Sequence, residues 1–581
     1  MRLAGNLLTV VGCLWKVVQG FKEQRVNKKV KAKVKTINGG VEAWVEGIWT
    51  GSVAFLAGFA GLYFGSMALF RVGIPLSFWS SILFFLPAVA GCVIMRPGRS
   101  GWLVFGGMIS IIAASVLAAL PFRDLTWDGM AVRQIWVEDV LLRKQCPEAL
   151  PSTHLLSAWL GLLGGSVDAG KAANPLLMFC AFGFVLKAVT EAGFQGVGRW
   201  LIALVAALNP VSLYQLSSFY LDGSFAALLT CQCGAFLTLF LYPKKTVAWL
   251  SGALCFLLLA TAKVSGLAYG ALLMAGLFFC IAVHRSIQLR FLATGLVILL
   301  SLGWLAHRLE RQVSYNLPLL IKSTDPNTRF FGVESAPANI RGRNKLEIFL
   351  LSHLSASALL PNEWKIKPPF WFTRPELSVF QDLNPDSRAG GFGPLYGTVL
   401  LVALAGVLVW PFWNQVPWQC WIPAVTLMIS CLLSQSWWAR WVPQAWLIPL
   451  CLALPVMAFA QKSPASRLST GSLWLALINS LLIASFYVVG CLENRKLVEE
   501  QIQFLKKLPS PIEIWVPDFP SNLTWLQQAG ISFKKLAKEP ETPRLKLQRT
   551  TSRVDLPKNW RQFLGNEPMV ETWRKRGLLE E

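Results

Sequence analysis

The chain has 581 residues, of which 54% are hydrophobic and 15% are charged, and its formal net charge at pH 7 is +23. A soluble domain cannot bury this much apolar side chain, which excludes a soluble globular protein and indicates a polytopic membrane protein. A positive charge suggests nucleic acid in a soluble protein. Here the basic residues lie beside apolar runs, where they encode membrane topology, and we expect no nucleic-acid partner.

The N-terminal segment is strongly basic and contains Glu23 as its single acid within the first 35 residues. An apolar stretch from Leu7 to Val18 is too short to span a bilayer, and no small-residue cleavage site follows it. This pattern predicts an interfacial amphipathic helix and not a signal peptide. We expect residues 1–47 to form a basic cytoplasmic segment.

Apolar runs of about twenty residues, the length that crosses a bilayer, follow throughout residues 48–491. They predict an all-α transmembrane domain of about thirteen helices. The expected spans lie near 48–70, 76–95, 102–121, 173–190, 200–221, 223–242, 247–262, 264–283, 288–306, 393–413, 418–435, 441–460 and 472–491.

The basic loops between these runs predict the orientation, because positively charged loops remain in the cytoplasm. They place the N-terminus inside, and the long segments 122–172 and 307–392 and the tail 492–581 outside. Segment 307–392 is long for a connection, and a functional lid and an interfacial anchor are both open for it. The basic loop residues are Arg96, Arg99, Arg199, Lys244, Lys245, His284, Arg285, Arg290, Lys462 and Arg467.

The tail carries the pattern of a small α/β domain. Ile512 to Val516 reads as a strand, Ser521 to Gln528 as a helix with Ser521 as its cap, and Ser532 to Leu536 as a second strand. We therefore expect residues 492–581 to form a small extracytoplasmic α/β domain built on a β-α-β unit.

The first outer segment begins with Arg123-Asp124-Leu125-Thr126-Trp127-Asp128-Gly129 and reaches Arg133. It places two carboxylates and two guanidiniums at a membrane boundary, where charge usually has a function. A solvated loop leading into an interfacial helix is the alternative. A second amphipathic stretch, 152–163, is expected to lie along the membrane plane, and His154 within it is expected to be a packing or capping residue.

Three further charged residues fall at the outer ends of apolar runs. Asp222 follows the polar stretch 208–221, where Asn209 and Gln215 indicate a face that meets protein or water. An Asp-Gly turn between helices and convergence with Asp128 are both open for it. Lys263 and Arg440 run against the positive-inside bias, and each requires an anionic partner, either a headgroup phosphate or the phosphate of a lipid substrate.

Several of these segments together resemble the glycosyltransferase C superfamily, and most of all its bacterial membrane members related to aminoarabinose and mannosyl transferases. The resemblance covers roughly residues 102–460. Many relatives have Tyr-His where this chain has Val132-Arg133, on the acceptor side of the site. The segments that carry the resemblance are Trp127-Asp128-Gly129, Tyr220-Leu221-Asp222-Gly223, Ala262-Lys263, Gly390-Gly391-Phe392-Gly393-Pro394-Leu395 and Trp438-Ala439-Arg440-Trp441-Val442-Pro443.

The resemblance implies transfer of a sugar from a polyprenyl-phosphate donor to an acceptor on the extracytoplasmic face. Such a transfer needs a carboxylate to take the proton of the acceptor hydroxyl and cations to hold the departing phosphate. Asp128 is the candidate base, and Lys263 and Arg440 are the candidate phosphate ligands. Asp222, Asp124 and Arg133 are candidates for positioning donor or acceptor.

A single displacement predicts inversion at the anomeric carbon. We expect no cofactor. A divalent metal stays open as an alternative, although no His, Asp and Glu cluster indicates a site for one. The expected partners are the sugar donor, membrane lipid and an acceptor that is a glycan, lipid or protein, in the inner membrane of a bacterium. A transporter or lipid flippase is the alternative from another class, although no second copy of the Asp128 or Asp222 segment indicates an internal repeat. An inactive scaffold also remains open.

Overall fold

The structure is a computed structural model. It describes residues 28–145, 150–243, 245–285, 295, 343–359, 366–383, 387–410, 418–432, 435–541, 543–563 and 567–581. The interfacial helix predicted between Leu7 and Val18 lies outside these residues, as do most of the predicted span 288–306 and the first part of segment 307–392.

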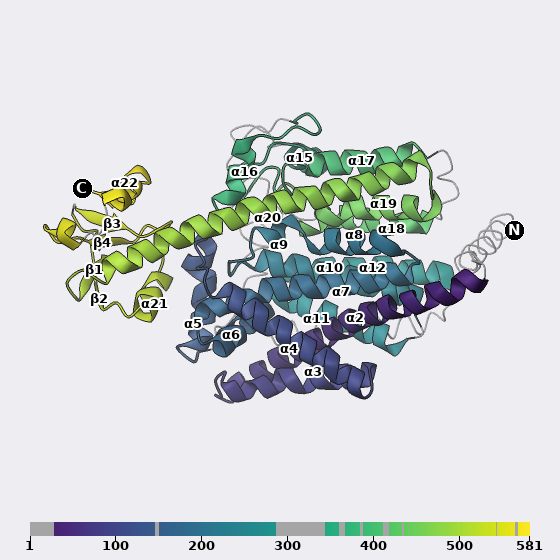
Figure 1. Cartoon of the computed structure of the whole chain (residues 1–581), viewed down its shortest axis with the longest axis horizontal. Coiled ribbons are helices and arrows are strands. Elements are labelled where there is room, and N and C mark those ends of the chain that lie inside the picture. The colour runs from purple at the N-terminus through teal and green to yellow at the C-terminus, as the bar shows by residue number, and fades with distance from the viewer. Residues whose placement is uncertain are drawn as a thin grey trace.

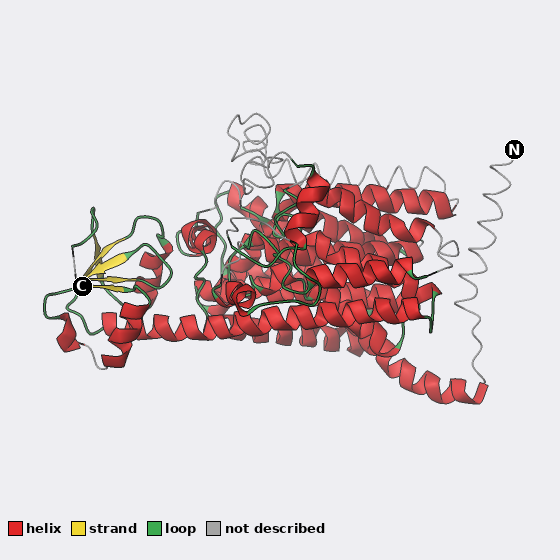
Figure 2. Ribbon diagram, turned by 90° about the horizontal axis from the view of Figure 1, so that it is seen from above, coloured by secondary structure: helices red, strands yellow, loops and turns green. Residues whose placement is uncertain are grey.

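The described chain forms a long helical bundle with a small sheet at one end (Figures 1 and 2). The pairs α7 and α10, α2 and α3, and α17 and α20 are among the most extensive helix contacts of the bundle. The helices are α2 Lys28–Arg71, α3 Ser81–Met95, α4 Arg99–Ala119, α5 Gln134–Leu141, α6 Ser152–Gly164, α7 Ala173–Glu191, α8 Gly196–Ala207, α9 Pro210–Leu213, α10 Leu221–Leu241, α11 Thr246–Ala262, α12 Val264–Arg285, α15 Lys345–His353, α16 Arg374–Gln381, α17 Tyr396–Leu408, α18 Ile422–Leu432, α19 Ile448–Phe459, α20 Pro464–Leu505, α21 Ser521–Gln528 and α22 Glu567–Lys575.

Among the described residues, 6 helices are long and apolar enough to cross a membrane. They confirm a mostly helical membrane protein. The count of about thirteen stays a prediction, because part of the chain lies outside the described residues and further apolar helices, such as α17 and α18, are shorter than 18 residues. The candidate spans are Gly40–Arg71, Phe78–Met95, Arg99–Ala119, Val167–Glu191, Leu221–Leu241 and Pro464–Leu505.

The predicted continuous span 200–221 is wrong. Helix α8 ends at Ala207, the four-residue α9 follows, and turns lead to α10. Pro210 explains the break, because proline disfavours a helical conformation of the residue before it. The side chain of that residue, Asn209, accepts a hydrogen bond from the backbone N–H of Val211 at 3.0 Å and so starts the new turn. The hydropathy of residues 200–221 shows how long the apolar stretch is, but it does not show that the helix is continuous.

Both expected domain boundaries fall inside helices. α2 continues without interruption through residue 47, and α20 continues through residue 491. At 1.5 Å per residue the 42 residues of α20 extend about 63 Å, twice the thickness of the hydrocarbon core of a bilayer. The second half of α20 carries the C-terminal residues away from the helical bundle (Figure 1).

The C-terminal residues fold on a five-stranded sheet with the order β2-β1-β4-β3-β5. The predicted β-α-β unit is present, since β1 and β2 pair in parallel and α21 connects them. The other pairings are antiparallel. The strands are β1 Ile512–Trp515, β2 Phe533–Lys535, β3 Arg544–Lys546, β4 Arg553–Asp555 and β5 Leu579–Glu580.

Helix α6 is buried within the protein over most of its length. All ten of its residues from Ser152 to Gly161 are buried, because the helix packs among α5, α7 and the turn that precedes α7. His154 is 1% exposed, and its Nε2 lies 3.2 Å from the carbonyl oxygen of Phe219. It is the packing residue that the sequence predicts.

The start of α2 and the C-terminal sheet lie at opposite ends of the molecule (Figure 1). This arrangement accords with a cytoplasmic N-terminus and an external tail, which the basic loops predict. Reporter fusions after Lys245 and at Glu581 should therefore report opposite sides of the membrane. A reporter active only in the cytoplasm, paired with one active only outside, makes each fusion its own control. If both positions report the same side, the predicted orientation is wrong.

Candidate active site

A π-helical turn carries the first candidate carboxylate. After α4 the chain runs through residues 120–128 and enters the π-helical turn Gly129–Arg133, with Asp128 at its N-terminal boundary. π-Helical turns are rare in proteins overall, but a large share of those that occur lie at functional sites. The Asp128 carboxylate lies 3.2 Å from Nη1 of Arg440, and 35% of its side chain is exposed. The turn thus presents a carboxylate that is paired on one side and accessible on the other.

Hydrogen bonds to the Asp124 carboxylate hold the segment that leads into this turn. Asp124 is fully buried and accepts hydrogen bonds from the backbone N–H of Thr126 at 2.9 Å, the Thr126 hydroxyl at 2.6 Å and the backbone N–H of Phe219 at 2.7 Å. Burial raises the pKa of Asp124, and these hydrogen bonds and Lys171 oppose the rise. A Cβ on Gly129 would lie 2.1 Å from Oδ2 of Asp124, so only glycine fits there. Asp124 is a structural tie and does not pair with Arg123.

The second carboxylate, Asp222, forms a buried ion pair. Its Oδ1 lies 2.6 Å from Nζ of Lys263, and the two side chains are only 9% and 16% exposed. Asp222 sits in the first turn of α10, and Lys263 sits between α11 and α12. These helices pack on each other, which brings residues 41 positions apart into contact.

Arg133 joins the two ion pairs into one cluster. Burial lowers its pKa, while Asp222 and Asp128 oppose this and Arg440 adds to it. Arg133 forms no hydrogen bond or ion pair of its own within the described ranges, although its guanidinium lies 4.8 Å over the ring of Trp136. Three cations and two carboxylates leave one excess positive charge. An anion with a single charge would balance the cluster.

Aromatic rings surround the cations. Arg440 lies 4.3 Å over the ring of Trp438 and 5.4 Å over that of Tyr220, and Lys263 lies 4.0 Å over that of Trp441. The Tyr220 hydroxyl also accepts a long hydrogen bond, 3.4 Å, from the backbone N–H of Asp128. Faces of aromatic rings hold cations and also stack on sugar rings.

The polar residues of the broken span hold the cluster together. Asn209 donates to the carbonyl oxygen of Pro443 at 2.9 Å, which fixes the turn that carries Arg440. Gln215 accepts from the backbone N–H of Gly223 at 2.7 Å, next to Asp222. Asn209 and Gln215 are buried, so this stretch meets protein and not lipid.

The structure thus brings Asp128, Asp222, Lys263, Arg440 and Arg133 together. Asp124 is not part of this cluster, and its hydrogen bonds hold the neighbouring segments in place. Three further site residues, Tyr220, Trp438 and Trp441, are not predicted from the sequence, although each stands within two positions of a charged candidate. Within the described ranges no group of three His, Cys, Asp or Glu side chains could hold a metal ion.

No family model matches the chain, and no curated protein matches it. Among solved structures, it is similar to ArnT from Cupriavidus metallidurans bound to undecaprenyl phosphate, with 13% identity, a TM-score of 0.42 and coverage of 76% of this chain and 87% of that one. The structure of the same protein in the apo state gives 13% identity, a TM-score of 0.42 and coverage of 76% and 86%. These values describe a distant likeness of fold, which by itself assigns no activity to this chain.

Proposed function

We propose that the protein is a membrane glycosyltransferase that moves a sugar from a polyprenyl-phosphate donor to an acceptor hydroxyl on the extracytoplasmic face. The observation that supports this most is the cluster of Asp128, Asp222, Lys263, Arg440 and Arg133, with its excess positive charge, at one end of an apolar helical bundle. A sugar phosphodiester of a lipid carries one negative charge and an apolar tail, and it matches both features.

The proposed reaction uses the accessible carboxylate as the base. Asp128 takes the proton of the acceptor hydroxyl, and the acceptor oxygen attacks the anomeric carbon. The bond from that carbon to the phosphate oxygen breaks, and the lipid phosphate leaves with the electron pair. Arg133, Arg440 and Lys263 stabilise the charge that develops on it. Attack and departure on opposite faces of the sugar give inversion.

Asp128 is better placed than Asp222 to act as the base, because its carboxylate is more accessible. An acceptor hydroxyl must come within hydrogen-bond reach of the base, at about 2.6–3.2 Å. The Asp128 side chain is 35% exposed, whereas that of Asp222 is 9% exposed and bound to Lys263. Asp222 therefore orients Lys263.

The lipid that co-purifies with the protein tests the substrate class directly. Mass spectrometry of an extract of the purified protein should show a polyprenyl phosphate, free or carrying a sugar, and the protein should transfer that sugar to an acceptor hydroxyl. If the purified protein moves a lipid across vesicle membranes without forming a new glycosidic bond, a transporter or flippase replaces the proposed enzyme.

The Arg133→Gln variant should bind a polyprenyl-phosphate donor about 10- to 100-fold more weakly, because it loses a charge-assisted contact of about 1.5–3 kcal/mol. Its thermal stability should change little, since Arg133 has no ion-pair partner among the described residues that its loss would leave unpaired. Donor binding is measured on the purified variants. Arg143→Gln is the matched control, because Arg143 is half exposed and, among the described residues, its ion-pair partner is Asp139 on the same segment. Equal binding by both variants would remove Arg133 from the phosphate site.

Lys263 and Arg440 require a different design, because each holds a carboxylate in this structure. Lys263→Ala alone would leave Asp222 buried without its partner, which costs about 3–5 kcal/mol and confuses folding with binding. The double variant Asp222→Asn with Lys263→Met removes both charges together. It isolates the contribution of this pair to donor binding.

A further inference from the structure

Helix α21 of the C-terminal domain docks directly on the π-helical turn. The Ser521 hydroxyl donates a hydrogen bond of 2.8 Å to the carbonyl oxygen of Met130, which lies two residues after Asp128. The ring of Phe519 meets the ring of Trp127 edge to face at 4.7 Å between centroids. The domain therefore contacts the turn on both sides of the proposed base.

Two further contacts extend this interface. The Thr524 hydroxyl donates to Oε2 of Glu138 at 2.8 Å. Arg123 donates from Nη2 to Oδ1 of Asn522 at 2.9 Å, and its guanidinium lies 3.8 Å over the ring of Trp525. Contacts thus reach both ends of segment 123–138, nearly 400 residues away in sequence. Asn522 is 2% exposed, so α21 is fitted to this surface.

Ser521 is not the N-cap of α21 that the sequence predicts. The N-cap of α21 is Pro520, and Ser521 is the first helical residue, so its hydroxyl is free to leave the helix and reach Met130. It is fully buried, and a buried hydroxyl needs a hydrogen-bond partner. Ser521 thus bridges two parts of the chain.

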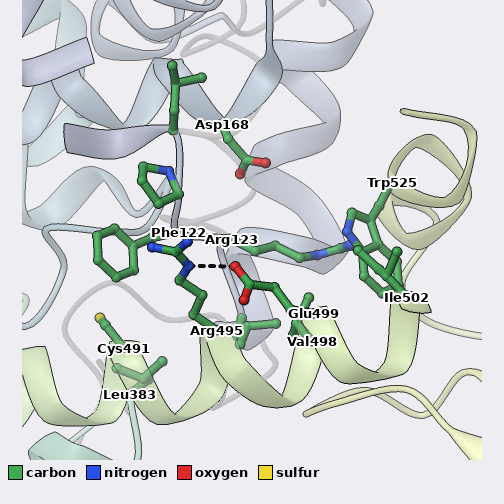
Figure 3. A pocket seen from close by; sticks show the side chains of 13 residues that line it. Phe122, Arg123, Asp168, Leu383, Cys491, Arg495, Val498, Glu499, Ile502 and Trp525 are labelled. Atoms are coloured by element: carbon green, nitrogen blue, oxygen red, sulfur yellow. Dashed lines mark hydrogen bonds and ion pairs between the residues drawn. The ribbon is translucent and has the colours of Figure 1, made fainter. Parts of the chain in front are cut away.

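The interface between α21 and segment 123–138 borders a cavity. A cavity of about 170 Å³ lies beside it, between the end of α4, helix α20 and α21 (Figure 3). Arg123, Asp168, Glu499 and Trp525 are among its lining residues. Figure 3 shows Arg123 extending from the bundle towards Trp525, across this cavity. A few polar contacts and ring contacts hold the two parts together, so single side chains affect how firmly the turn is held.

We propose that α21 is a positioning element for the Asp128 turn and that Ser521 is a positioning residue, which holds the turn in the conformation that aims the Asp128 carboxylate at the acceptor. The proposal rests on the proposed transferase function. Ser521 touches neither substrate nor the reacting atoms. It acts through the backbone of Met130, whereas the donor-binding cation Lys263 lies on another segment of the chain.

The Ser521→Ala variant tests this proposal in the full-length protein. We expect kcat for sugar transfer to fall about 3- to 10-fold, as loss of one hydrogen bond implies, while the melting temperature stays near that of the parent. Ser521→Thr keeps the hydroxyl and should restore kcat. Gln527→Ala is the matched control, because Gln527 is exposed on the same helix. A fall in kcat that Thr does not rescue would overturn the role of the hydroxyl.

A second measurement separates this proposal from the proposed function. Hydrogen exchange of the backbone amides of residues 126–134 should speed up about 3- to 10-fold in Ser521→Ala and not in Gln527→Ala. This readout needs no substrate. Unchanged exchange would overturn the positioning role even if the protein is a transferase. Faster exchange in a protein without transferase activity would support the positioning role of Ser521 and overturn the proposed function.

Discussion

Replacing Asp128 by Asn should slow sugar transfer by about 10²- to 10⁴-fold, the usual contribution of a positioned general base. The amide has the same shape and still accepts the hydrogen bond from Arg440, so the π-helical turn should keep its conformation. The amide cannot take the proton of the acceptor hydroxyl. Donor binding should therefore remain near that of the parent while kcat falls, which single-turnover kinetics with saturating donor can measure.

Asp139→Asn is the matched control for this experiment. Asp139 lies on α5, in the same segment between α4 and α6, and pairs at 2.5 Å with Arg143, whose side chain is half exposed. Exposed pairs of this kind contribute little, so transfer should stay within about twofold of the parent. If Asp128→Asn transfers like the parent, Asp128 is not the base. If Asp222→Asn also transfers like the parent, the cluster is not the reacting centre.

The charged candidates could be selected from sequence because charge beside a bilayer is costly. Asp128, Asp222, Lys263 and Arg440 each stand at the end of an apolar run, where hydropathy singles them out. Their pairing could not be predicted. Arg440 meets Asp128 across 312 positions, and no local pattern encodes such a contact. The choice of partner follows from how the helices pack.

Other features escaped the sequence analysis because the signals were short or ambiguous. Strands β3 and β4 have three residues each, which is too few for a visible alternation of apolar and polar positions. Pro210 signalled a break that the apolar length of 200–221 outweighed. Ser521 matched a capping pattern displaced by one position, and its true partner, Met130, lies on another part of the chain.

Asp124 shows how sequence and structure give different expectations for one residue. Its sequence neighbour Arg123 predicts a local charge pair, for which an amide would be a mild change. The structure instead places Arg123 against Asn522, and it gives Asp124 three hydrogen-bond donors. Two of these donors belong to Thr126, and the third is the backbone N–H of Phe219. Asp124 therefore joins the loop before Asp128 to the segment before Asp222.

Replacing Asp124 by Asn should consequently lower the free energy of unfolding by about 2–5 kcal/mol. The amide oxygen can serve Thr126, but the amide N–H₂ would then face the N–H of Phe219, and this leaves buried donors without an acceptor at about 1–3 kcal/mol each. The melting temperature of the purified variant should fall together with transfer and donor binding, because the two halves of the cluster are no longer held at the same separation. Asp128→Asn should show the opposite pattern, with unchanged melting and slow transfer. If Asp124→Asn melts like the parent yet does not transfer, Asp124 takes part in the chemistry, and the assignment of the base to Asp128 fails.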